Sequence, residues 1–236
     1  PKVGGRYSVL SLVGMLPAMI SGLSAEQVRH GAEQVLETCL NASSARDCPA
    51  AMGAAVAVGL AQNRAITGSV MLAYSDRLGS LARWYRQLWA ESLGKDGQGT
   101  TPIYGTGPVD QHSQLQLWLD GPADKMFTVL GGPIARGSAP IDGSLVDDEA
   151  LSFMVGRTLG DLMEMSRRAT AETLAAHGRP VRLITVEDFN ETSMGALMMH
   201  FMLETILAAD LMGVDPFDQP AVEHGKVLLR RYMSEM

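Results

Sequence analysis

The chain has 236 residues, of which 46% are hydrophobic and only 19% are charged. A chain of this length and composition can bury a sizeable hydrophobic core, so an intrinsically disordered protein is excluded. Its 26 acidic residues outnumber its 19 basic residues and give a formal net charge of −7. This balance argues against a surface for nucleic acids or anionic membranes, because both need clustered lysine and arginine.

A glycine-rich turn opens the chain, with Gly-Gly-Arg at residues 4–6. Two glycines let a backbone approach a ligand closely, and the arginine adds a fixed positive fork, although an ordinary turn before a helix explains the same residues. The uncharged stretch Tyr7–Ala25 is long enough to raise the question of a membrane span. Pro17, two glycines and four serines disfavour a span, so a buried helix over about residues 8–20 is predicted.

Two further helices follow, the first beginning at a Ser24 cap and running to about Leu40, the second covering about residues 50–62. The only two cysteines of the chain, Cys39 and Cys48, lie on either side of the polar loop between these helices. A disulfide between them is possible. With only two cysteines, however, the reduced state of a cytosolic protein is favoured.

Strands and helices alternate along the rest of the chain. Apolar stretches predict strands over Thr67–Tyr74, Thr101–Tyr104, Lys125–Leu130 and Pro180–Val186, the first and last of them buried. Helices are expected from an Asp76 cap, over Glu149–Ala176 and Asn190–Met212, and from near Asp218. This order predicts one α/β domain, a three-layer αβα sandwich around a mainly parallel sheet with flavodoxin-like layering.

The stretch Trp84–Pro122 concentrates polar groups on apolar scaffolding, which is how a sugar-sized ligand is usually bound. Gln87 and Glu91 are four residues apart and share a helical face, and a second helical segment carries His112. The plainer interpretation is a solvated glutamate and a satisfied histidine, and spacing alone does not decide between the two. The five histidines show no metal-ligand spacing, and no phosphate-binding P-loop is present, so no metal or cofactor is expected.

Four blocks of sequence, in this order, resemble the glucose-6-phosphate isomerase family. They are GGRYSVLSLVGMLP, YSDRLGSLARWYRQLWAESLGK, GTTPIYGTGPVDQHSQLQLWLDGP and DPFDQPAVEHGK, and they extend across essentially the whole chain. The resemblance implies a sugar-isomerase (SIS) fold with two such domains per subunit and a dimer. Residues 1–236 correspond to the second SIS domain with the C-terminal helices. The first SIS domain, with its Ser/Thr/Gly-rich phosphate loop, is absent from this sequence.

The resemblance also assigns roles in the transfer of a proton between adjacent carbons. Glu91, in the Q-x-x-x-E motif, is then the catalytic base, and its partner Gln87 contacts the substrate. Arg6, in the GGRYS motif, lies beside the developing enediolate, and Gly5 is a further substrate contact. A single base that takes and returns the proton suits a glutamate, and a positioned arginine suits the enediolate oxygen.

The remaining roles concern ring opening and substrate contact. The resemblance implies that His112, in the DQHS segment, reaches the site from the neighbouring subunit of a homodimer. Lys226, in the E-x-G-K motif, is with His112 a candidate for opening the sugar ring, and Gln219 is a further substrate contact. Ring opening is acid–base chemistry separate from the proton shuttle, so a second pair of groups is sensible.

The expected function is therefore a cytoplasmic isomerase that interconverts glucose 6-phosphate and fructose 6-phosphate in glycolysis and gluconeogenesis, without a cofactor. One alternative is a non-catalytic module that binds sugar phosphates. The joint presence of Glu91, His112 and Lys226 counts against it. The other alternative is a folded but inactive fragment, which the residues do not exclude. The missing half could have been lost by truncation or could belong to a second polypeptide.

Overall fold

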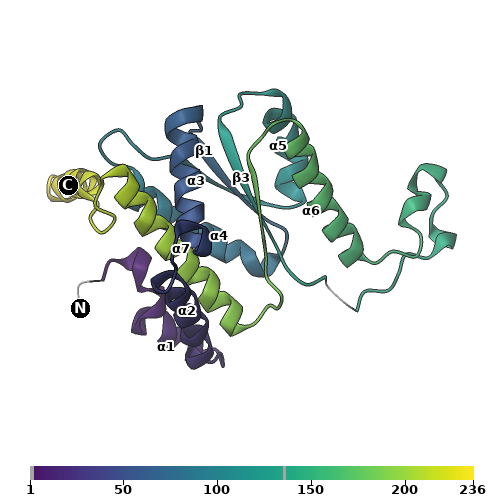
Figure 1. The fold of residues 1–236 in the computed structure, drawn as a ribbon, viewed down its shortest axis with the longest axis horizontal. Helices are drawn as coiled ribbons and strands as arrows, with labels where there is room; N and C mark the ends of the chain where they lie inside the picture. Colours follow the sequence, from purple (N-terminus) through teal and green to yellow (C-terminus); the bar gives the residue numbers. More distant parts are fainter. Residues whose placement is uncertain (1–2, 135–136) are drawn as a thin grey trace.

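The computed structural model describes residues 3–134 and 137–236. Within those ranges four parallel strands form one sheet in the order β2-β1-β3-β4 (Figure 1). The strands are β1 (Gly68–Ala73), β2 (Thr101–Thr106), β3 (Lys125–Gly131) and β4 (Val181–Thr185). The α-helices are α1 (Leu12–Ile20), α2 (Ala25–Leu40), α3 (Pro49–Arg64), α4 (Asp76–Leu93), α5 (Val109–Asp120), α6 (Leu159–Ala176), α7 (Glu191–Met212) and α8 (Glu223–Ser234). Short 3₁₀-helices are η1 (Gly5–Leu10), η2 (Ala45–Asp47), η3 (Gly143–Leu145), η4 (Glu149–Met154) and η5 (Pro220–Val222).

The predicted three-layer αβα sandwich is confirmed, and strand β1 shows how its two cores are separated. Met71 and Ala73 point into a core with α3, α4 and α7, whereas Val70 and Leu72 point into a core with α5 and α6. Successive side chains of a strand face opposite sides, so a central strand covered on both faces is apolar throughout. Every residue of β1 is buried.

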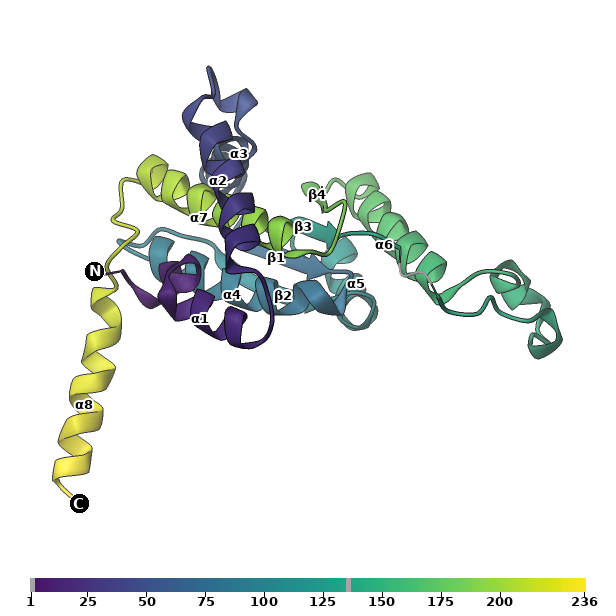
Figure 2. The ribbon, with the colours of Figure 1, turned by 90° about the horizontal axis from the view of Figure 1, so that it is seen from below.

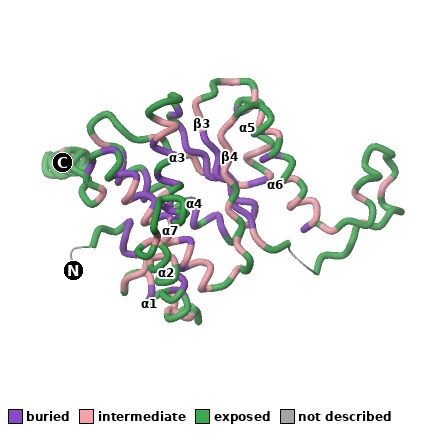
Figure 3. Tube along the Cα trace, in the orientation of Figure 1, coloured by how far each residue is buried: buried purple, intermediate pink, exposed green. Residues whose placement is uncertain are grey.

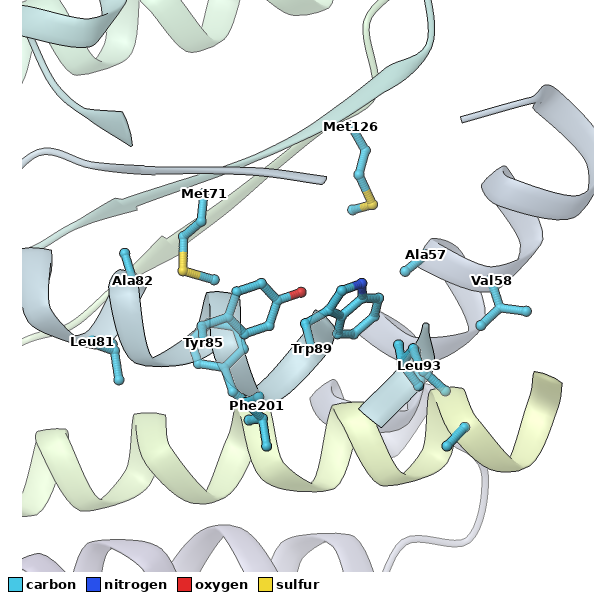
Figure 4. Packing of buried hydrophobic residues seen from close by; sticks show 14 of the residues in the cluster. Ala57, Val58, Met71, Leu81, Ala82, Tyr85, Trp89, Leu93, Met126 and Phe201 are labelled. Carbon is cyan, nitrogen blue, oxygen red and sulfur yellow. The ribbon is translucent and has the colours of Figure 1, made fainter. Parts of the chain in front are cut away.

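The larger core is built around aromatic side chains from α4 and α7 (Figure 4). The ring of Tyr85 lies 5.5 Å from that of Trp89 and 4.9 Å from that of Phe201, centroid to centroid. All three rings are at most 2% exposed. This packing fixes α4, the helix that carries Gln87 and Glu91, against the rest of the domain.

Helix α7 is long and apolar enough to cross a membrane by length and composition. It lies within the helical layer of the domain, where it contacts α2, α3 and α4. Its closest neighbour is α2, and two glycines, Gly31 and Gly195, allow the two backbones to approach each other. The apolar composition of α7 is therefore explained by the core that it helps to form.

The prediction of a buried helix over residues 8–20 was wrong in two respects. Ser11 has extended backbone dihedrals and caps α1, so the segment is divided into η1 and α1. Within α1 only Met15 is buried, and apolar side chains such as Leu12 and Ile20 are about four-fifths exposed, at 83% and 78%. Apolar composition shows that a helix face is suited to burial. It does not show which part of the molecule covers that face.

Three other predictions need correction. Strand β4 is not buried but forms an edge of the sheet, and its Leu183 is 57% exposed. The helix expected from residue 149 begins as η4 and is interrupted at Gly156, whose φ is +74°, before α6 begins. Thr158 and Asp161 form a capping box there. The residue at the N-cap of α4 is Ser75, not Asp76.

Two parts of the chain stand away from this body (Figure 2). Helix α8 projects from one end of the molecule, and the segment over residues 137–158 extends from the other. Both are largely exposed, as is the outer face of α1 (Figure 3). Exposed apolar side chains occur in all three, including Leu16, Phe153 and Met233.

Candidate active site

Helix α4 presents two of the predicted site residues on its solvent-facing side. Gln87 and Glu91 are one helical turn apart, and the Gln87 amide Nε2 donates to Glu91 Oε1 over 3.0 Å. The opposite face of the same turn is buried, because Leu88 and Ser92 have no exposed surface. The amphipathic pattern of α4 thus fixes the orientation of the Glu91 carboxylate.

Arg6, from η1, joins this turn of α4 to the segment after α7. Its side chain is only 2% exposed, and its guanidinium ion pairs with Glu91, Nη1 to Oε2, over 3.1 Å. The other hydrogen bonds of the guanidinium go to Ser92 Oγ (2.9 Å), Gln219 Oε1 (2.7 Å), Pro216 O (2.7 Å) and Asp218 O (2.9 Å). Three segments that are far apart in sequence are thereby held around one charge.

Neighbouring aromatic residues hold Arg6 in this position. The indole Nε1 of Trp84 donates to the carbonyl of Arg6 over 3.0 Å. Tyr7 shares a 3.0 Å hydrogen bond with Ser92 Oγ, and its ring packs 5.3 Å from that of Phe217. Burial raises the pKa of the Tyr7 phenol, which the hydrogen bond with Ser92 and the nearby guanidinium partly offset, so this phenol stays neutral.

Lys95 is a further member of the site that the sequence did not reveal. Its ammonium ion pairs with Asp218 over 2.9 Å and donates to the carbonyls of Ser92 and Asp215. A lysine just beyond the end of a helix, four residues after Glu91, is a recognisable signal, because cations there bind the last carbonyls of the helix.

An open cavity of about 640 Å³ borders these residues. Its lining includes Glu91, Lys95 and Gln219, together with backbone and small side chains of η5. The Glu91 side chain remains 33% exposed, while Arg6 and Gln87 each hold one of its two carboxylate oxygens. Gly5 is exposed next to Arg6, and the space around its Cα is open.

His112 lies at the other end of the domain from Glu91. Helix α4 runs from the carboxyl edge of the sheet, where Asp76 follows β1, to the amino edge, where Trp89 Nε1 donates to Thr100 Oγ1 just before β2. Glu91 is fifteen residues beyond Asp76, about 22 Å along the helix. His112 is exposed in the first turn of α5, which begins at the carboxyl edge.

Lys226 is also separate from the cavity. It is exposed on the projecting helix α8, and its Nζ ion pairs with Glu223 of the same helix over 2.6 Å. The structure therefore brings together Arg6, Gln87, Glu91 and Gln219 but leaves His112 and Lys226 apart from them. Within the described residues, no three His, Cys, Asp or Glu side chains gather as a metal site would require.

A second charged cluster, in the large core, was also missed by the sequence analysis. Glu204 of α7 is fully buried, and its Oε2 lies 2.8 Å from Arg182 Nη1 and 3.0 Å from His200 Nε2. Burial alone would raise the pKa of Glu204, but the charge of Arg182 and the adjacent His200 imidazole outweigh it and hold this pKa below its ordinary value. An arginine within an apolar strand, and a His–Glu pair at i, i+4 in an apolar helix, are the signals that could have indicated it.

The sequence model of the family described as Phosphoglucose isomerase matches residues 1–121, which is more than half of the chain. The chain belongs to the phosphoglucose isomerase family. A relative named glucose-6-phosphate isomerase, from Rubrobacter xylanophilus, is 41% identical over 226 residues, covering 96% of this chain and 52% of the relative. Another relative with that name, from Thermus thermophilus, is 37% identical over 240 residues, which cover 99% of this chain and 56% of the relative.

Two solved structures share this fold. The crystal structure of a hypothetical protein from Thermus thermophilus matches with a TM-score of 0.86 and 36% identity, over 98% of this chain and 55% of that one. The crystal structure of a glucose-6-phosphate isomerase from Chlamydia trachomatis matches with a TM-score of 0.78 over 99% of this chain and 47% of that one. At 19% identity, this match supports the fold alone. The chain thus spans about half the length of the two named relatives and of the two solved chains.

Proposed function

We propose that this chain carries the C-terminal half of the active site of a glucose-6-phosphate isomerase. In the complete protein, glucose 6-phosphate and fructose 6-phosphate are interconverted through an enediolate. The observation that carries the proposal is that Arg6 holds together Glu91 and Gln219, two side chains that line an open cavity. The names of the relatives supply the substrate class.

The geometry suits a proton shuttle between neighbouring carbons. Glu91 takes the proton from C2 of the open-chain sugar and returns it to C1, and the reverse reaction uses the same carboxylate. Charge builds up on the enediolate oxygen during the transfer. Arg6 supplies a fixed positive charge 3.1 Å from the base and needs no reorganisation, because its hydrogen bonds already hold it. Gln87 orients Glu91 and contacts substrate.

Ring opening is assigned to His112 and Lys226, with His112 supplied by the second subunit of a homodimer. The separation of His112 from Glu91 within one chain favours a shared site, since about 22 Å of helix lies between Asp76 and Glu91. Lys226 reaches the site when α8 packs against a surface that this chain does not provide. The first SIS domain supplies the phosphate loop, and the protein acts in the cytoplasm without a metal or cofactor, in glycolysis and gluconeogenesis.

Substitution Glu91→Gln tests the proposal in a protein that contains both halves. The amide keeps the shape of the carboxylate and a carbonyl oxygen for Arg6 but cannot accept the C2 proton. Substrate binding should change little, while turnover should fall by about 10²–10⁴-fold or more. Exchange of the C2 proton with solvent deuterium, followed by NMR, should fall in parallel.

The matched control is Glu172→Gln, the same chemical change at a side chain of α6 that is 74% exposed. This control should leave both the turnover and the rate of C2 proton exchange unchanged. Normal C2 exchange in the Glu91→Gln protein would show that another group is the base.

A further inference from the structure

The two cysteines of the chain meet where α2 ends and α3 begins. Cys39 lies in the last turn of α2 and Cys48 is the N-cap of α3. The two Sγ atoms are 3.0 Å apart, and the thiol of Cys48 donates to the sulfur of Cys39. Both are free thiols, Cys48 only 2% exposed and Cys39 half-buried. Neither belongs to the site around Glu91.

Local structure holds both sulfurs in this position. The Sγ of Cys48 accepts from the Ala51 amide over 3.5 Å at the start of α3, and the Cys48 amide donates to the Ala45 carbonyl of η2. The amide of Asn41 closes the end of α2 by donating to the Glu37 carbonyl over 2.9 Å. A disulfide needs sulfurs about 2.05 Å apart. The two Sγ atoms must therefore approach each other by about 1 Å.

We propose that Cys39 and Cys48 are a redox modification site, at which a small-molecule disulfide converts the two thiols into a reversible disulfide that clamps α2 to α3. The more exposed Cys39 thiolate attacks one sulfur of the oxidant, forms a mixed disulfide and releases one thiolate. Cys48 then attacks Cys39 Sγ and releases the second thiolate. The two protons lost by the cysteines go to the released thiolates, so the oxidant is reduced to two thiols by two electrons.

The chemistry of Cys39 sets the conditions for this exchange. Partial burial, together with the hydrogen bond and proximity of the Cys48 thiol, raises the pKa of Cys39 to about 11. Only the thiolate attacks, so the first step is slow at neutral pH, and the thiolate fraction rises about a hundredfold between pH 7 and pH 9. Oxidation of the pair should therefore be faster at pH 9 than at pH 7.

The disulfide should stabilise the fold without changing it. Both α2 and α3 pack against α7, so the clamp joins two helices whose relative position the core already fixes. A cross-link across a loop of about ten residues restricts the unfolded chain, and the expected rise in Tm is about 5–10 °C.

The test is to incubate the chain with oxidised glutathione at about pH 9, alkylate the remaining thiols, and digest with trypsin. Arg46 lies between the two cysteines, so residues 30–46 and 47–64 are separate tryptic peptides that only a disulfide joins. We expect mass spectrometry to find these two peptides joined by a disulfide within a single chain. The Tm should rise in the oxidised chain and return to its initial value after reduction with dithiothreitol.

Cys39→Ser and Cys48→Ser are the controls, and neither should show an oxidation-dependent rise in Tm. Serine is itself a good N-cap, so Cys48→Ser should keep α3 intact. A glutathione adduct on Cys39 with Cys48 still open to alkylation would overturn the proposal. Cross-links found only between chains, or an equal rise in Tm in the serine variants, would do the same.

Discussion

At the scale of single residues, Arg6 engages every N–H donor of its guanidinium group. Its hydrogen bonds to three side chains and two carbonyls match the five N–H donors of the planar group. An ammonium has three donors on one atom and cannot reach these acceptors together. The choice of arginine is therefore explained by the two chain segments, around Ser92 and Gln219, that it holds beside Glu91.

Arg6→Lys should consequently loosen the segment after α7 while keeping the positive charge. Buried acceptors such as the Pro216 carbonyl lose their donor, so we expect a loss of about 2–4 kcal/mol in the free energy of unfolding. Amide hydrogen exchange over residues 214–219 should become faster. Arg86→Lys, an exposed change on α4, is the control and should alter neither measurement. Unchanged exchange in Arg6→Lys would contradict this role.

The buried Glu204 gives a prediction with a pH dependence. Its folded-state pKa is lower than the unfolded value, so its charge contributes stability that is present above the unfolded pKa and is lost as the pH falls through the folded pKa. Glu204→Gln leaves Arg182 without its countercharge. The variant should lose about 3–5 kcal/mol of the free energy of unfolding at pH 7.

The difference between the wild-type chain and Glu204→Gln should narrow as the pH is lowered from about 5 to about 3, measured by urea unfolding. The exposed change Glu172→Gln serves as the control and should cost little at any pH. A constant difference over this range would show that folding does not lower the pKa of Glu204.

At the scale of elements, the crossing of α2 and α7 depends on two glycines. A Cβ atom at Gly31 would lie 1.9 Å from the Thr192 carbonyl oxygen, and one at Gly195 would lie 1.7 Å from that of Val28. Both obstacles are backbone atoms, which cannot move without separating the helices. Gly31→Ala should therefore destabilise the fold by about 1–3 kcal/mol despite the better helix propensity of alanine.

Gly59→Ala is the matched control for Gly31→Ala, because it lies in the interior of α3 with nothing near the added methyl group. It should stabilise the chain by up to about 1 kcal/mol. Thermal unfolding of the two variants should thus shift in opposite directions. If both were stabilised, the close approach of α2 and α7 would not limit side-chain size.

The elements that could be predicted are those whose local pattern and tertiary environment agree. The apolar run of β1 predicted a strand covered on both faces, and the Ser24 cap marked the start of α2 because its side chain accepts from Gln27. The exposure of α1 and the edge position of β4 could not be predicted. They depend on which strands and domains are neighbours, and a local pattern carries no such information.

The candidate site likewise contains some residues whose positions follow from a local pattern and others whose positions do not. Gln87 and Glu91 could be placed together because four residues make one helical turn, a local relation. The meeting of Arg6, Glu91 and Gln219 spans more than two hundred residues of sequence, and spacing gave no sign of it; only the resemblance to a family suggested it. Lys95 and the Arg182–Glu204 pair were missed because their local signals, a lysine just beyond a helix end and an arginine within an apolar strand, do not identify a partner that is distant in sequence.

At the scale of the whole molecule, helices α1 and α8 carry exposed apolar side chains. Leu12, Val13 and Ile20 of α1 are 83%, 70% and 78% exposed, and Leu229 and Met233 of α8 are 61% and 66% exposed. Faces of this kind usually contact another protein surface. The chain spans about half the length of its relatives, so we expect the part of those proteins that it does not cover to contact α1 and α8.

The isolated 236-residue chain should therefore fold but show little or no isomerase activity. The phosphate group lies far from the reacting carbons, yet binding energy from such remote groups positions the substrate for reaction, and the phosphate loop is expected in the absent half. The chain should also self-associate through its exposed faces, which light scattering can measure. Adding in trans the part of the Rubrobacter xylanophilus relative that this chain does not cover should restore some turnover, and Glu91→Gln should remove it again. A chain of confirmed mass that interconverts the two sugar phosphates alone at an ordinary enzyme rate would contradict the prediction, and would require a phosphate-binding group within residues 1–236.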